Sequence, residues 1–171
     1  MKYRQLGNTG LAVSEVGLGC EGMIGGSPEL VRELVDAALI CGMNYFDLFC
    51  AQPDVRSNLG SCLRGRREQV YIQGHIGACW HQGQYLRTRE KPLVTAGFED
   101  LLARLDTDYL DVGMIHYVDS QDDFDAVFQG WMMDYVRSLK QTGRIRHIGL
   151  SSHNPDIALQ AARTGLVEVL L

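Results

Sequence analysis

Asp47, His75 and His116 each stand where an apolar run of this chain ends, and Ser151 and Ser152 end a fourth such run. A carboxylate next to an imidazole can hold a proton and transfer it near neutral pH. Serine hydroxyls can donate hydrogen bonds to a ligand and also accept them. These residue types predict acid–base chemistry and polar ligand binding, provided that the fold brings the four run ends together.

Stretches with helical periodicity separate these runs, so strand and helix patterns alternate along the chain. Such alternation predicts a parallel sheet of the α/β class. In parallel α/β folds, ligands bind at the carboxyl ends of the strands. We therefore expect Asp47, His75, His116, Ser151 and Ser152 to converge on one pocket.

A β-hairpin is expected to precede six strands, because two short alternating runs flank a Gly/Asn turn at residues 7–10. Ser27 and Asn154 are expected N-caps, since each precedes a proline at the first position of a helix. The expected strands cover residues 16–20, 44–47, 70–75, 109–115, 145–150 and 166–171. The expected helices cover residues 28–41, 55–63, 92–105, 124–142 and 155–164.

Two segments stand out from this pattern. Residues 76–91 are polar, contain glycine and lack periodicity, so we expect a long loop that could fold over the pocket. Residues 124–139 carry the strongest helical stripe of apolar side chains in the chain, with Gly143 after it. We interpret this stripe as core packing and not as a cofactor site.

The composition predicts one soluble globular domain over residues 1–171, since 46% of the residues are hydrophobic and 22% are charged. The formal net charge of −5 provides no basic patch for a polyanion, so no nucleic-acid partner is expected. No apolar run approaches the roughly 20 residues needed to span a membrane, and the amino terminus has no signal-peptide core. No membrane partner is therefore expected.

The five cysteines are odd in number and never closer than nine positions apart. This spacing excludes a CxxC metal or redox motif and favours reduced thiols in a cytoplasmic protein. His81 has no partner at ligand spacing and is assigned no metal role. We therefore expect no bound metal.

Four ordered segments resemble the aldo-keto reductase family. Residues 2–11 (KYRQLGNTGL), with the Val13-Ser14 and Gly17-Leu18-Gly19 that follow, resemble its N-terminal hairpin and first strand. Residues 44–47 (NYFD) resemble the strand that ends in its catalytic aspartate, and residues 109–116 resemble the strand that ends in its catalytic histidine. Residues 143–152 (GRIRHIGLSS) resemble the strand whose polar end holds the nicotinamide carboxamide.

The resemblance implies a TIM-type (β/α)8 barrel that binds NADPH or NADH without a Rossmann domain, and no GxGxxG follows the first strand here. It implies hydride transfer to an aldehyde or ketone, so a small carbonyl compound is the expected substrate. In the family, a tyrosine protonates the alkoxide, a lysine and the aspartate tune that tyrosine, and the histidine orients the carbonyl. The implied cofactor contacts are Gly19, Cys20, Ser151 and Ser152.

Asp47 and His116 match the family's aspartate and histidine, whereas two other catalytic positions differ. Gln52 stands where the tyrosine is expected, and an amide is not a useful proton donor. His75 stands where the lysine is expected. An imidazolium there could replace the lost cation beside Asp47 and donate a proton near neutrality. We therefore hypothesise an Asp47–His75 pair, with His75 or His116 as the substitute acid.

Six strands are fewer than the eight of a complete barrel, which typically needs about 250 residues. The first and sixth strands would be open edges of an incomplete (β/α)8 sheet. Three alternatives follow. The chain is the amino-terminal part of a longer reductase, or a non-catalytic interaction or regulatory module that self-associates through its edge strands, or a degenerate fragment without function.

Overall fold

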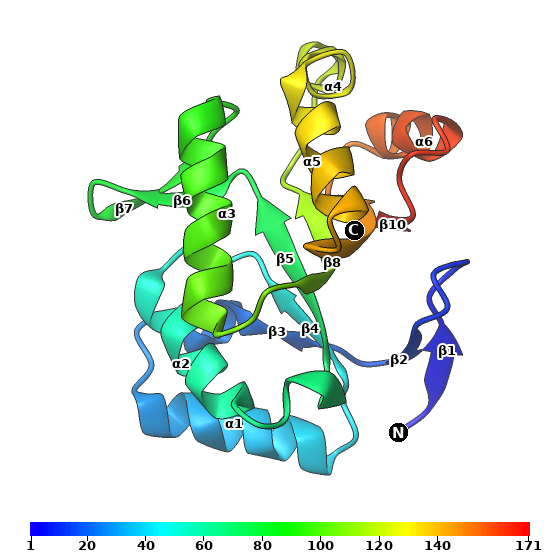
Figure 1. The fold of residues 1–171 in the computed structure, drawn as a ribbon. Coiled ribbons are helices and arrows are strands. Elements are labelled where there is room, and N and C mark those ends of the chain that lie inside the picture. Colours follow the sequence, from blue (N-terminus) through cyan, green and yellow to red (C-terminus); the bar gives the residue numbers. More distant parts are fainter.

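A parallel sheet of six strands runs through the computed structural model, which describes residues 1–171 (Figure 1). Its order is β10-β9-β8-β5-β4-β3, so strands that follow one another in the chain also lie side by side. A doubly wound sheet would reverse its order at a switch point, whereas a barrel advances in one direction. The sheet therefore curls as part of a TIM-type barrel. Its strands are β3 (Leu18–Gly19), β4 (Tyr45–Leu48), β5 (Tyr71–Ile76), β8 (Leu110–Ile115), β9 (Ile145–Leu150) and β10 (Val169–Leu170).

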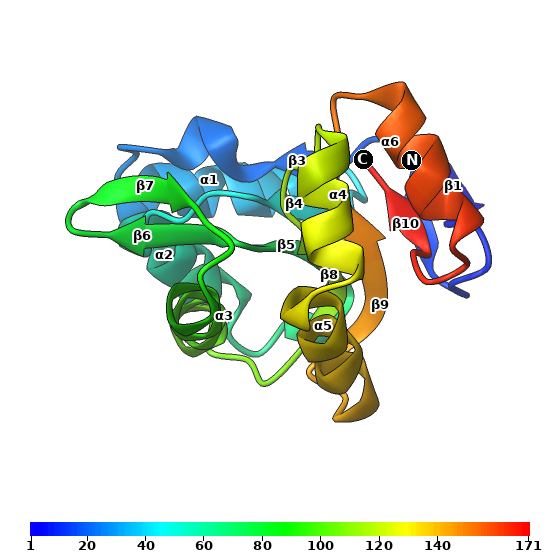
Figure 2. The same ribbon diagram turned by 90° about the horizontal axis from the view of Figure 1, so that it is seen from above.

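Helices connect the strands and lie outside the curled sheet, as the view from above shows (Figure 2). Both expected N-caps are confirmed: Ser27 Oγ accepts from Leu30 N at 3.2 Å, and Asn154 Oδ1 accepts from Asp156 N at 3.0 Å. None of the helices is long and apolar enough to cross a membrane. The helices are α1 (Pro28–Ile40), α2 (Pro53–Leu63), α3 (Lys91–Leu105), α4 (Gln121–Phe128), α5 (Trp131–Gln141) and α6 (Pro155–Arg163), with short 3-10 turns η1 (Cys20–Met23) and η2 (Arg67–Gln69).

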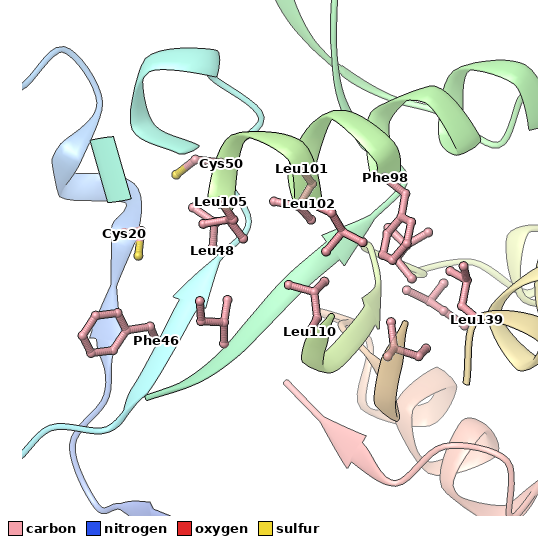
Figure 3. Close-up of a cluster of buried hydrophobic side chains, with 14 of the residues drawn as sticks. Cys20, Phe46, Leu48, Cys50, Phe98, Leu101, Leu102, Leu105, Leu110 and Leu139 are labelled. Atoms are coloured by element: carbon pink, nitrogen blue, oxygen red, sulfur yellow. The ribbon is translucent and has the colours of Figure 1, made fainter. Parts of the chain in front are cut away.

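The main core lies between the helices and the outer face of the sheet. Leu101 and Leu105 of α3 pack with Leu48 of β4 in this core (Figure 3). Fully burying one leucine side chain stabilises a fold by roughly 1.5–3 kcal/mol, so this layer holds the strands in register. The register in turn fixes where the strand ends and their polar residues lie.

A smaller cluster lies on the inner face of the sheet. Leu11 and Val13, at the β2 side of an N-terminal hairpin, pack against Val112 and Met114 of β8. The hairpin consists of β1 (Tyr3–Gln5) and β2 (Ala12–Ser14), and Asn44 Oδ1 accepts from Ser14 N at 2.7 Å. The predicted hairpin is thus confirmed, and it covers the sheet at the end opposite the predicted pocket.

The prediction of a long loop over residues 76–91 is wrong. These residues form a second hairpin, β6 (Ala78–His81) paired antiparallel with β7 (Gln84–Arg87), which projects from the sheet (Figure 1). Gln82 and Gly83 have φ values of 49° and 79°, the left-handed conformation that a two-residue hairpin turn requires. The signal in the sequence was the glycine between two short runs, and the polarity of those runs concealed it.

The stripe expected to form one helix is divided in two. Helix α4 ends at Phe128 and α5 begins at Trp131, because Gly130 is extended with φ −100° and ψ −175°. A Cβ added at Gly130 would lie 2.2 Å from Ala126 O, so only glycine fits this break. The two edge strands, β3 and β10, are also shorter than the sequence predicted.

Candidate active site

The inner face of the sheet carries a row of polar side chains at the carboxyl ends of its strands. Asp47 of β4 lies in register with Gln73 of β5, and His75 lies two residues further along β5. Alternate residues of a strand point to the same face, so these three side chains share the inner face. His116 extends β8 by one residue, and its amide donates to Ile76 O at 3.0 Å.

Hydrogen bonds join these side chains into one line. Gln73 Nε2 donates to Asp47 Oδ1 at 2.7 Å, and His75 Nε2 lies 3.0 Å from the same oxygen. His75 Nδ1 lies 2.7 Å from His116 Nδ1. His75 and His116 are 4% and 8% exposed, so water does not compete freely for these contacts. The fold therefore builds the Asp47–His75 pair and connects it to His116.

Tyr85 completes the line, and the sequence did not predict it. Its hydroxyl lies 2.7 Å from His116 Nε2, and its ring meets the His116 ring edge-on. Tyr85 lies on β7, directly opposite Trp80 of β6. The phenol therefore reaches the strand ends from a hairpin 31 residues before His116, which no local pattern in the sequence could reveal.

Two arginines of β7 and the segment after it hold this hairpin over the strand ends. Arg87 Nε donates to Tyr117 O at 3.0 Å, and Arg89 donates to His116 O at 2.8 Å. Both guanidinium groups also pair with Asp123 of α4. Charge-assisted bonds of this kind add geometric specificity. The hairpin is thus fastened to the backbone of His116 itself.

The surroundings set the charge of each member. Burial is the main cause that lowers the pKa of His116 from 6.5 to about 3, and the neighbouring His75 imidazole lowers it further. Burial raises the pKa of Asp47, but hydrogen bonds from His75 and Gln73 outweigh it and hold that pKa below its usual range. Burial also raises the pKa of Tyr85. At neutral pH, Asp47 is an anion, His116 is neutral and Tyr85 retains its proton.

A cavity of about 490 Å³ opens above this line. Its wall includes Asp47, His75 and His116 together with Tyr85 and Phe49, whose ring stacks on His116 with an interplanar angle of 1°. Small-molecule sites typically measure about 300–1,000 Å³, so the cavity suits a compact ligand. Ser151 and Ser152 form part of the same wall, which brings all four predicted strand ends to one place.

Comparison with known proteins identifies the family to which this site belongs. Residues 15–170 match the model of the aldo/keto reductase family. The chain belongs to the aldo/keto reductase family. This match confirms the resemblance seen in the sequence. The six-stranded parallel sheet confirms the TIM-type architecture.

Individual relatives agree with this assignment. The chain is 27% identical to the uncharacterized oxidoreductase YqkF of Bacillus subtilis, an alignment that covers 100% of this chain and 56% of YqkF. It is 28% identical to the aldo-keto reductase YhdN of the same organism, over 89% of this chain and 47% of YhdN. The holo form of aldo-keto reductase AKR11C1 from Bacillus halodurans superimposes with a TM-score of 0.82 at 30% identity, over 99% of this chain and 55% of AKR11C1. The chain thus spans about half the length of the curated relatives it matches.

The remaining predicted site residues of this reductase-family chain differ in their surroundings. Gln52 is the N-cap residue of α2, and its buried Oε1 has no hydrogen-bond partner. Gly19 pairs with Asp47 between β3 and β4, and Cys20 is fully buried. None of these three contributes to the cavity wall. Their catalytic or cofactor-binding roles stay predictions.

Proposed function

We propose that this chain reduces an aldehyde or ketone with a hydride from NADPH or NADH, using a proton donor other than the family's usual tyrosine. The observation that carries the proposal is the line of hydrogen bonds from Asp47 through His75 and His116, in the wall of a cavity at the carboxyl ends of the strands. Ligands of parallel α/β folds bind at this end. A proton is needed there once a carbonyl oxygen becomes an alkoxide.

The donor set beside the cavity fits a nicotinamide carboxamide. Ser151 Oγ accepts from Tyr117 N at 2.8 Å, and the structure contains no protein acceptor for its own hydroxyl hydrogen. That hydrogen can therefore be donated to a carboxamide oxygen. Ser152 Oγ already lies 3.1 Å from Asp119 Oδ1 and accepts from Asn154 N at 3.0 Å, so it has less capacity for a ligand. When bound, the cofactor supplies a hydride to the carbonyl carbon.

Asp47, His75 and His116 keep a proton available beside that carbonyl. Asp47 accepts from His75 Nε2 and so orients the imidazole, with Gln73 holding the same carboxylate oxygen. A cation next to a buried carboxylate is favourable, and protonated His75 can serve where the family has a lysine. Phe49 lies parallel to His116 in the cavity wall and adds an apolar surface beside it.

The experiment that tests this function is a titration of the chain with NADPH and with NADH, followed by nicotinamide fluorescence, with benzaldehyde then added to each mixture. Saturable binding and loss of the reduced nicotinamide after the aldehyde is added are the expected results. Comparing the two titrations also decides which nucleotide is preferred. Binding without any loss of the reduced form, or no binding at all, would contradict the proposal.

A second candidate function is that of an interaction module. Edge strands β3 and β10 each have a sheet neighbour on one side only, and an open edge can pair with another chain. Sedimentation of the chain at several concentrations tests self-association. A stable oligomer that does not bind either nucleotide would favour the module over the enzyme.

The five cysteines are free thiols, which supports the proposal of a cytoplasmic location.

A further inference from the structure

We infer that Tyr85 is the acid of the proposed reduction, and that His75 and His116 return a proton to it. This inference rests on the proposed function and names the donor that the function requires. The family's usual tyrosine position holds Gln52, so the phenol reaches the pocket here from the β6–β7 hairpin. Tyr85 is a catalytic residue in this account, and the two imidazoles form its proton supply.

Neither imidazole has a nitrogen free to face a substrate. His75 uses Nε2 with Asp47 and Nδ1 with His116. His116 uses Nδ1 with His75 and Nε2 with Tyr85. The Tyr85 oxygen can form two contacts at once, since a phenol both donates and accepts a hydrogen bond. Tyr85 is therefore the member of the line that can accept from His116 and still donate into the cavity.

Simple counting of hydrogens fixes the direction of every bond in the resting state. The Asp47 carboxylate only accepts, so His75 Nε2 carries a hydrogen. With both imidazoles neutral, His75 Nδ1 is bare and accepts from His116 Nδ1–H. His116 Nε2 is then bare and accepts the Tyr85 hydroxyl. All donors in this state point toward Asp47, so Tyr85 has no hydrogen to offer a substrate.

One added proton reverses two of these hydrogen bonds and frees the Tyr85 hydroxyl hydrogen for a substrate. When His75 is protonated at both nitrogens, its Nδ1–H donates to His116 Nδ1. The hydrogen of neutral His116 then lies on Nε2 and donates to the Tyr85 oxygen. The Tyr85 O–H is released to point into the cavity. The added positive charge stays on His75, next to the Asp47 carboxylate that stabilises it.

The atoms balance across the reduction. The hydride forms the new C–H bond, the carbonyl oxygen becomes an alkoxide, and that oxygen takes the Tyr85 hydroxyl proton. The phenolate oxygen takes the proton from His116 Nε2, and His116 Nδ1 takes the proton from His75 Nδ1. His75 ends neutral with its remaining hydrogen toward Asp47, which is the resting state described above. Solvent in the cavity supplies the next proton at the Tyr85 oxygen, and transfer through His116 to His75 Nδ1 restores the protonated state.

The charges around Tyr85 agree with this role. Burial raises its pKa and keeps the hydroxyl protonated at neutral pH, while Arg87 of β7 and Arg89, just after it, act in the opposite direction. An alkoxide is a far stronger base than a phenolate, so the transfer runs downhill. The other titratable groups beside the cavity are Asp47, Glu21 and His153, and Asp123 pairs with both arginines.

The test compares Tyr85→Phe with Tyr109→Phe in the full chain. Tyr109 lies at the amino end of β8 and stacks against Arg67 and Arg146, away from the cavity. Single-turnover loss of NADPH with benzaldehyde should be about 100-fold slower or more in Tyr85→Phe, within the range typical of general acids. NADPH affinity should be unchanged in both variants. Nitrogen chemical shifts of His116 should change only in Tyr85→Phe, which gives a readout independent of activity.

Each outcome decides the inference. If Tyr85→Phe transfers hydride as fast as wild type, Tyr85 is not the acid, and the proposed function still stands. If wild type itself transfers no hydride, the proposed function is wrong, and the role of Tyr85 as its acid is wrong as well. Should Tyr85→Phe not fold, fluorotyrosine at position 85 replaces it, because its more acidic phenol should shift the pH profile of the rate to lower pH. An unshifted profile would overturn the inference.

Discussion

Nδ1 of His75 and Nδ1 of His116 lie 2.7 Å apart, so the two imidazoles share a single hydrogen between them. If both nitrogens carried a hydrogen, the two N–H groups would repel each other. The pair therefore has two arrangements, with the hydrogen on His116 or on His75. This choice determines whether His116 Nε2 donates a hydrogen bond to the Tyr85 oxygen or accepts one from it. The charge of the Asp47–His75 pair is thereby coupled to the position of the phenol proton.

The pH dependence of stability should expose the buried neutral His116. Burial, with His75, Arg89 and Arg87, lowers its folded-state pKa to about 3 from 6.5. Between these values the unfolded chain takes up a proton that the folded chain does not, so the free energy of unfolding falls as pH falls. The contribution approaches about 1.4 kcal/mol per pH unit. In His116→Gln, urea unfolding at stepped pH should show a shallower fall, while His81→Gln should follow wild type. Superimposable curves for His116→Gln and wild type would contradict the buried neutral state.

Removing Arg89, which follows the β6–β7 hairpin, should loosen Tyr85 without unfolding the sheet. Arg89 donates to the carbonyl oxygens of His116 and Tyr117 and pairs with Asp123. In Arg89→Gln, we expect faster hydrogen exchange at residues 78–87 and about tenfold slower hydride transfer. Arg137→Gln is the control, because Arg137 is exposed on α5. Unchanged exchange at these amides would show that the arginine does not hold the hairpin.

Ser151→Ala should weaken nucleotide binding by removing one donor to the carboxamide. The loss of a single neutral hydrogen bond costs about 0.5–1.5 kcal/mol, which is roughly a 2–10-fold increase in Kd. Nicotinamide fluorescence titration measures this change, and Ser138→Ala on the exposed side of α5 provides the control. Equal affinities of Ser151→Ala and wild type would remove Ser151 from the cofactor site.

Gly60→Ala should destabilise the packing of α2 on α3. A Cβ at this position would lie 2.3 Å from Arg104 O and 2.8 Å from Leu105 C, so the two helices would have to separate. Overpacking of this kind costs about 1–3 kcal/mol, and backbone contacts place this site at the upper end. Gly22→Ala, where the added atom meets nothing within 4 Å, should unfold in urea close to wild type. Similar midpoints for the two variants would contradict the close approach of the helices.

The sequence was sufficient to predict Asp47, His75 and His116 as neighbours, since each stands at the end of an apolar run and alternation places all three on one face. It was not sufficient for Tyr85. Residues 78–87 lack a continuous apolar run, and the hairpin is positioned by contacts of Arg87 and Arg89 with residues about 30 positions away. Similarly, the break at Gly130 depends on the absence of a Cβ, which would collide with Ala126 O, while the apolar stripe continues through it. Long-range contacts and backbone sterics, which periodicity does not encode, decided both features.

The most direct test of the central claim follows the hydride itself. The chain is mixed with benzaldehyde and with reduced nicotinamide cofactor that carries deuterium at the transferable position, and the alcohol is examined by mass spectrometry. Hydride transfer in the pocket above Asp47, His75 and His116 predicts deuterium on the carbinol carbon of the product. Alcohol without deuterium, or labelled cofactor that stays reduced in the presence of the aldehyde, would contradict the account.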